Sequence, residues 1–327
     1  MDALRFSVGL PETIEGDDPR PVTVYAARAE ALGFTGLWSL DSAVGGATST
    51  TALLDGLQLL AHAAAVTDNV RLGIAVIVMN RRQPVLLAKE LASLDRLTGG
   101  RLTVGVGLGA PTDEHAASLG FPADRRVRRL TEGVEIMRAL WSGNEVSHDG
   151  ELMSFSRARI EPKPVQRPGP PVWFGAGREP ALRRAARLGD GWIGAGSSSA
   201  EDFALQAAIV REALAEEGRD AARFPFAKRV YLAVEDDAQV GMRRMTAILD
   251  EMYGWPGLAE RCAVCGPPER IAQTVGDLAA AGCEEVVLTP MYGITGTAVA
   301  TLIAAIARSG ALTIFINRKM GLRVPAF

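Results

Sequence analysis

Short apolar runs of strand length alternate with amphipathic, alanine-rich helical stretches along the chain, and this rhythm is the strongest constraint on its fold. Such alternation indicates βαβ units, in which helices cover a parallel sheet. We expect strands at residues 5–10, 36–40, 70–78, 102–108, 171–175, 191–194, 230–234 and 285–289. We expect helices at 21–32, 51–66, 85–97, 125–141, 179–188, 200–217, 238–253 and 268–281, with a ninth at 297–308.

The number of these units decides between two architectures. Eight strands that are each followed by a helix fill a closed barrel, whereas an open doubly wound sheet usually has about six strands. A chain of 327 residues could hold about two average domains, but also one barrel of roughly 250 residues with insertions. We therefore expect an α/β fold, a (β/α)8 TIM barrel formed by residues 1–310 as a single domain.

Three stretches depart from the alternation. Residues 142–170 hold a hairpin pattern around Asp149 and Gly150 and then a proline-rich link, which predicts an insertion after the fourth helix. Residues 255–267 are irregular and could form part of the barrel mouth, where functional loops gather. Residues 311–327 form a β-prone tail to which the sequence assigns no role.

Composition argues against several classes of function. Hydrophobic residues make up 48% and charged residues 22% of the chain, as in ordinary folded proteins. The formal net charge of -3 offers no basic field for nucleic acid, so we expect none as a partner. The N-terminal sequence lacks a secretory-signal pattern, and no run of about eighteen apolar residues occurs. These features predict a cytoplasmic protein without a membrane segment.

The cysteines give no argument for a metal. Cys262, Cys265 and Cys283 are an odd number in a large chain, which fits reduced thiols. The first two have the spacing of a redox pair or half a zinc site, but no second pair occurs and no histidine lies near them in sequence. We therefore expect no metal site.

Alternate glycines occupy the end of the fourth expected strand, at Gly105, Gly107 and Gly109. They leave one face of the strand without side chains, so a planar ring could approach the backbone closely. Small residues also suit the crowded interior of a barrel. The pattern by itself leaves both interpretations open.

A second glycine motif joins the fifth expected strand to the next helix through Gly175, Ala176, Gly177 and Arg178. Backbone N–H groups of such a turn and of a helix N-terminus can bind a phosphate, and an arginine adds a charged donor. The motif resembles a dinucleotide fingerprint only weakly, because Pro180 occupies the third glycine position. A tight turn without a ligand is the alternative.

Polar residues follow three expected strands at the end where barrel active sites form. After the second strand, Asp41 could steer a proton or bind a ring, with the Ser42 hydroxyl beside it, or Asp41 could cap a loop. After the third strand, Arg81 and Arg82 could bind an anionic substrate or form a solvated rim. After the fourth, His115 is a candidate acid–base group, although a histidine on a helix face is the alternative.

The order of these segments resembles the luciferase-like monooxygenase family, and in particular its branch that uses the deazaflavin coenzyme F-420. The resemblance covers about residues 5–309 and rests on several short motifs in the right order. They are residues 31–34 with Trp38, Pro84 with Ala88, and residues 94–109, 168–177 and 185–193.

The resemblance implies a barrel, usually dimeric, that holds a flavin or deazaflavin ring at the carboxyl ends of its strands. The strand glycines Gly107 and Gly109 would lie at this ring, and the cofactor phosphate would lie near the turn from Gly175 to Arg178. Many family members have a non-proline cis peptide against the ring, and the matching bond here is Ala75–Val76.

Two positions depart from the family pattern. Deazaflavin-dependent dehydrogenases in the family often have Asp-His after the second strand, where this chain has Asp41 and Ser42 and therefore no histidine for an acid–base role. After the fourth strand, Ala110 occupies the position where the family usually has an aromatic residue, and the smaller side chain leaves more room for a substrate.

From the residues and the resemblance together we expect an oxidoreductase that positions its cofactor and excludes water. We favour coenzyme F-420 and hydride transfer to or from a small organic substrate, by family analogy. An FMN-dependent monooxygenase that uses molecular oxygen is the alternative, and a non-catalytic flavin-binding barrel is the third possibility. We expect a homodimer.

Overall fold

A computed structural model of the chain describes residues 4–12, 18–41, 53–109, 119–120, 124–253 and 255–290. The expected ninth helix and the tail lie outside these residues.

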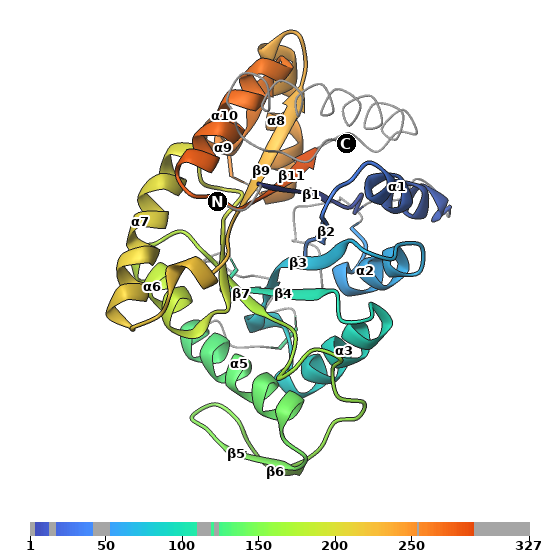
Figure 1. The fold of residues 1–327 in the computed structure, drawn as a ribbon, viewed down its shortest axis with the longest axis vertical. Coiled ribbons are helices and arrows are strands. Elements are labelled where there is room, and N and C mark those ends of the chain that lie inside the picture. Colours follow the sequence, from blue (N-terminus) through green and yellow to red (C-terminus); the bar gives the residue numbers. More distant parts are fainter. Residues whose placement is uncertain are drawn as a thin grey trace.

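Eight parallel strands close into a barrel, which confirms the predicted fold (Figure 1). The hydrogen-bonded order runs β1, β2, β3, β4, β7, β8, β9 and β11, and β11 pairs with β1 to complete the ring. The strands are β1 (Arg5–Gly9), β2 (Gly36–Ser39), β3 (Arg71–Val78), β4 (Leu102–Gly107), β7 (Val172–Ala176), β8 (Gly191–Gly194), β9 (Phe226–Val234) and β11 (Glu285–Pro290).

Helices surround this barrel (Figure 1). They are α1 (Arg20–Ala31), α2 (Gly56–Ala64), α3 (Pro84–Leu97), α5 (Arg126–Ser142), α6 (Glu179–Leu188), α7 (Ala200–Glu216), α8 (Ala238–Tyr253), α9 (Leu258–Cys262) and α10 (Pro268–Ala280), with the 3-10 turns η1 (Met79–Arg81) and η2 (Ala221–Arg223). The expected helix at 51–66 was placed too early, because the Asp55 side chain caps α2 by accepting bonds from the N–H groups of Leu57 and Gln58.

Two small elements interrupt the βα alternation. The strands β5 (Val146–Asp149) and β6 (Ser154–Ala158) pair as an antiparallel hairpin after α5, as the sequence predicted. The carboxylate of Glu132 on α5 fastens this hairpin, because it accepts bonds from the N–H groups of Leu152 and Met153. In Figure 1 the hairpin lies at the end of the molecule opposite to α8 and α10.

The stretch at 255–267 is more regular than expected, since it holds α9 and the short strand β10 (Val264–Gly266). Strand β10 pairs with residues 232–234 at the carboxyl end of β9, which agrees with a place at the barrel mouth. Tyr231 and Ala233 of β9 pack with α8 and α9 in a small core of their own.

Apolar side chains from six strands meet inside the barrel. They are Trp38, Ala75, Trp173, Ile193, Ala227 and Val287, and Trp38 and Trp173 lie with their ring centroids 5.6 Å apart. The amino-terminal end of the barrel is closed by Glu285, whose side chain is 1% exposed. This carboxylate accepts bonds from Ser7 Oγ (2.7 Å), Trp38 Nε1 (3.1 Å) and Arg71 Nη1 (2.8 Å). It therefore ties the first strands of the barrel to the last.

We predict that Glu285→Ala lowers the free energy of unfolding by about 3 kcal/mol or more, because it leaves buried donors without their acceptor. Urea denaturation measures the change. Glu284→Ala is the matched control, because the Glu284 side chain is 42% exposed and its loss should cost under about 1 kcal/mol. Equal losses in the two variants would contradict the assignment of Glu285 as the barrel closure.

Candidate active site at the barrel mouth

The predicted site residues within the described part of the chain gather at one end of the barrel. Asp41 follows β2, Arg81 and Arg82 lie in and just after η1, which follows β3, and Gly109 follows β4. The turn from Gly175 to Arg178 ends β7 and starts α6. Since all these strands are parallel, their carboxyl ends share one rim, which is where barrel enzymes place their sites.

Val76 on β3 packs directly on glycines of the next two strands of the barrel, β4 and β7. A Cβ atom on Gly107 would lie 2.6 Å from Val76 Cγ2, and one on Gly175 would lie 2.7 Å from Val76 Cγ1. These glycines therefore make room for the valine, which supports the packing interpretation for Gly107. The structure thereby brings Val76, Gly107 and Gly175 together as one surface.

The peptide bond Ala75–Val76 is cis, which confirms the expectation drawn from the resemblance. The pairing register between β3 and β4 shifts between Ile74 and Ile77, across the same residues. Ala75 is buried and Val76 is partly exposed, so the valine side chain is the part of this segment that a ligand at the mouth could reach.

Asp41 is bound from two sides. Its side chain is fully buried, forms an ion pair with Arg82, and accepts a bond from the N–H of Val78 (2.9 Å). The same Arg82 nitrogen reaches Asp55 Oδ2 at 2.9 Å. Asp41 and Arg82 thus fix the end of β2 to the end of β3 and to the start of α2. This pairing explains their position without a ligand, and proton handling by Asp41 stays a prediction.

The turn after β7 is open to solvent. Gly177 and Arg178 are exposed, and Ala176 is buried beneath them. A Cβ on Gly177 would meet no atom closer than the amide nitrogen of Gln206, at 3.6 Å. Helix α6 begins at this turn without a side-chain cap. Pro180 has no N–H, and the N–H of Ala181 donates to the Arg178 carbonyl (2.9 Å), so the N–H of Glu179 is the first-turn donor that an anion could reach.

The loop between β8 and α7 is held by a lysine that sequence reasoning missed. Lys228 is 2% exposed, and its Nζ donates to the carbonyls of Ala195, Ser198 (2.9 Å) and Arg229 (2.8 Å). Burial lowers the pKa of Lys228 to about 7. In the sequence, Lys228 could have been recognised only as a charged residue within an otherwise largely apolar strand.

Glu12 is a second residue that the sequence did not single out. It follows β1 at the mouth, and its carboxylate accepts a bond from the N–H of Leu40 at the end of β2. Burial raises the pKa of Glu12 to about 7, against the opposing charge of Arg229. A carboxyl group that titrates near neutral pH at a barrel mouth is a candidate proton donor or acceptor.

Asn80 adds an unsatisfied polar group beside η1. Its side chain is 1% exposed, and neither its amide nitrogen nor its amide oxygen has a hydrogen-bond partner among the residues that the structure describes. Buried amides usually have partners, so this one could serve a ligand. The sequence feature that could have singled out Asn80 is its place directly after β3, at the end of the strand where barrel sites form.

Ser42, Ala110 and His115 lie outside the described residues, so their predicted roles stay predictions. The three cysteines are free and buried, and the described residues contain no group of three or more His, Cys, Asp or Glu side chains placed to hold a metal.

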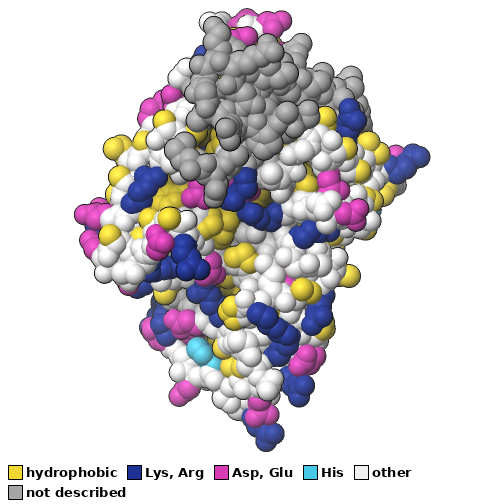
Figure 2. All heavy atoms as spheres, viewed as in Figure 1, with side chains coloured by type: hydrophobic (Ala, Val, Ile, Leu, Met, Phe, Trp, Pro, Cys, Tyr) yellow, Lys and Arg dark blue, Asp and Glu magenta, His cyan; other side chains and the backbone are white. Residues whose placement is uncertain are grey.

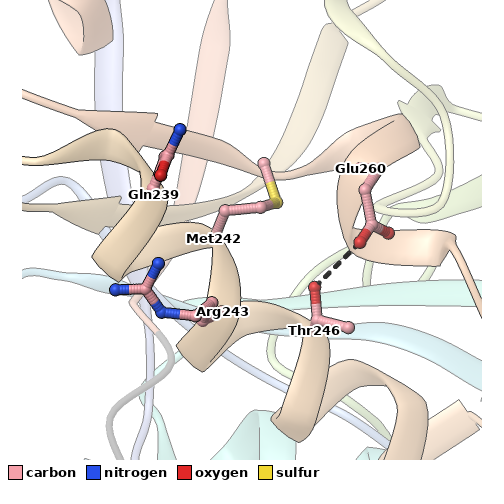
Figure 3. A pocket seen from close by; sticks show the side chains of 5 residues that line it. All are labelled: Gln239, Met242, Arg243, Thr246 and Glu260. Carbon is pink, nitrogen blue, oxygen red and sulfur yellow. Dashed lines mark hydrogen bonds between the residues drawn. The ribbon is translucent and has the colours of Figure 1, made fainter.

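A shallow pocket of about 420 Å³ lies on the outer surface, between α8 and α9 (Figure 3). Its lining consists of Gln239, Met242, Arg243, Thr246 and Glu260, and Thr246 donates to Glu260 Oε1 at 3.1 Å. None of these residues belongs to the predicted site. We place the candidate site at the mouth because the buried charged groups lie there.

The chain belongs to the luciferase-like monooxygenase family, whose sequence profile matches residues 4–255. An uncharacterised protein of Mycobacterium tuberculosis is 45% identical over 141 residues, which are 43% of this chain and 49% of that protein. This match therefore spans about half the length of that relative. An F-420-dependent glucose-6-phosphate dehydrogenase of Kineococcus radiotolerans is 29% identical over 237 residues, 71% of this chain and 69% of the relative.

Among solved structures, a monooxygenase from Streptomyces bottropensis superposes with a TM-score of 0.76 at 22% identity, over 97% of this chain and 99% of that one. This likeness shows the fold. No helix within the described residues is long and apolar enough to cross a membrane. Figure 2 shows positive and negative side chains interspersed over the visible face.

Because Val76 and Gly175 are in contact, we expect the effects of substituting them on the free energy of unfolding to be non-additive. Gly175→Ala should lower the free energy of unfolding by about 1–3 kcal/mol, because its Cβ would overlap a Val76 methyl group. In a Val76→Ala background the same change should cost at least about 1 kcal/mol less. A double-mutant cycle by urea denaturation measures this, and additive losses would show that the two residues do not share the surface.

Glu12 should make stability depend on pH. Its folded pKa of about 7 lies above the ordinary 4.5, so its contribution is fully present below pH 4.5 and is lost as the pH rises through about 7. Glu12→Gln cannot titrate. The wild type should therefore lose stability relative to the variant between about pH 5 and about pH 8 in urea titrations. A constant difference across that window would show that Glu12 has an ordinary pKa.

Proposed function

We propose that this protein is an oxidoreductase that uses coenzyme F-420 and transfers a hydride to or from a small organic substrate at the barrel mouth. The observation that carries the proposal is the convergence of Val76, Gly107 and Gly175 on one surface at the mouth. The relative named as an F-420-dependent dehydrogenase supports the choice of cofactor. The proposal does not extend to that relative's sugar phosphate.

The residues at the mouth fit a phosphate-bearing planar cofactor. The open turn at Gly177 and Arg178 has space for an anion next to the uncapped start of α6. Val76 and the exposed Gly109 would form the side on which the ring rests, with Ala75 and Gly107 buried beneath the valine. When bound, the deazaflavin would supply the hydride chemistry.

The other charged groups would prepare the site. Asp41 and Arg82 would hold the strand ends at fixed positions through their ion pair, and Arg81 would remain the candidate for an anionic substrate. Glu12 would exchange a proton with the substrate, the task for which the family often uses a histidine where this chain has Ser42. His115 remains a second candidate for that role.

A second function rests on the same family. It is FMN-dependent monooxygenation with molecular oxygen, and the Streptomyces bottropensis protein that shares this fold is named a monooxygenase. Titrating the purified protein separately with F-420 and FMN, followed by absorption spectra, distinguishes the two cofactors. Turnover of the reduced cofactor with a panel of substrates then distinguishes either enzyme from a non-catalytic flavin-binding barrel. The homodimer inferred from the resemblance is part of the proposal.

The phosphate turn gives a direct test. We predict that Gly177→Trp weakens cofactor binding at least about tenfold, because the indole would fill the open turn, while the fold survives since this position is exposed. Fluorescence titration measures affinity, and circular dichroism checks the fold. Leu205→Trp, at an exposed position on α7, is the control. Unchanged affinity in folded Gly177→Trp would rule out this turn as the anion site.

A further inference from the structure

Arg229 spans the interior of the barrel. Its strand β9 stands opposite β3, with β11, β1 and β2 between them on one side and β4, β7 and β8 on the other. From there Nη1 donates across the barrel to the carbonyl of Ala75 (3.1 Å), and Nε donates to Thr289 Oγ1 on β11 (3.2 Å). The residue is 7% exposed, so its guanidinium group is fixed within the barrel at the level of Ala75.

In the described part of the chain, no carboxylate is in direct contact with the guanidinium group of Arg229. Within the described residues its partners are a carbonyl, a hydroxyl and the ring of Tyr231, whose centroid lies 5.0 Å from the guanidinium carbon. Glu12 acts on it only as a charge without a hydrogen bond. An arginine stays protonated in proteins, and a buried cation without a contact anion is unfavourable. This position therefore favours the arrival of negative charge.

That charge lies beside the surface expected to bind the ring. The Ala75 carbonyl that Arg229 contacts belongs to the residue preceding Val76, and the methyl groups of Val76 pack over Gly107 and Gly175. The interior layer below is apolar, with Trp38 and Trp173 in contact. Because few mobile dipoles surround it, a charge here acts over a longer range than it would in water.

We propose that Arg229 makes the site bind the reduced cofactor more tightly than the oxidised cofactor; this rests on the proposed function. A hydride consists of one proton and two electrons and carries one negative charge. The oxidised ring would therefore gain one negative charge on accepting a hydride, and the substrate that gives up the hydride would lose that negative charge. A fixed positive charge beside the ring stabilises this product. The role of Arg229 is therefore electrostatic: its positive charge is held in place beside the ring before any substrate binds.

Two substitutions at this position separate charge from hydrogen bonding. Arg229→Gln keeps an N–H donor for the Ala75 carbonyl but removes the charge, whereas Arg229→Lys keeps the charge. The matched control is Arg71→Gln, which removes a charge at the amino-terminal end of the barrel, where Arg71 binds Glu285. Circular dichroism checks that each variant is folded.

The measurement is the dissociation constant of oxidised and of chemically reduced F-420 and FMN, titrated anaerobically without substrate. We expect the ratio of oxidised to reduced constants to fall about 10- to 100-fold in Arg229→Gln, the loss expected for one charged contact. Arg229→Lys and Arg71→Gln should stay within about threefold of the wild type.

The outcomes separate this inference from the function on which it rests. If wild-type protein binds neither cofactor, the proposed function and the inference both fail. If it binds one of them but Arg229→Gln keeps the wild-type ratio, only the inference fails. A ratio that falls equally in Arg229→Lys, or in Arg71→Gln, also overturns it, because then charge at this position is not the cause. Should Arg229→Gln be unfolded, a wild-type ratio in folded Arg229→Met overturns the inference in the same way.

Discussion

Closure of the sheet is the constraint on which the rest of this structure depends. Once β11 pairs with β1, every strand has one face inside the ring, and the interior must be filled by side chains from eight directions. The amino-terminal end is filled by Glu285 with its three donors and by Trp38 and Trp173. The carboxyl end holds the candidate active site, as is usual in barrels of this kind, whose amino-terminal end serves stability.

At that carboxyl end, one patch of the interior consists of glycine backbone and a single valine side chain. Gly107 and Gly175 have no side chains, and Val76 fills the space that they leave. A surface of this kind is apolar and closely packed, so it offers a flat contact to a ring but few polar groups to orient it. Polar contacts must then come from the turn after β7 and from the rim, where the exposed Arg178 and the buried Asn80 lie.

Buried charge gives the mouth its chemical character. Lys228 and Arg229 are neighbours on β9 and their side chains lie on opposite faces, one fastening the loop before α7 and the other crossing the barrel. Glu12 shares the field of Arg229 and titrates near neutral pH. A strand that carries two adjacent buried cations costs stability, and such a cost is common where a site needs preorganised charge.

The sequence by itself determined the eight strands, the helices around them, the hairpin and the family, because apolar periodicity and turn residues are local signals. It also located Asp41, Arg82 and the turn at Gly177. Only the tertiary structure decided that Val76 packs on Gly107 and Gly175, that Arg82 is paired with Asp41, and that Glu12 and Arg229 are buried at the mouth. The physical reason is that these contacts join residues far apart in the chain, and burial and charge pairing exist only once the barrel has closed.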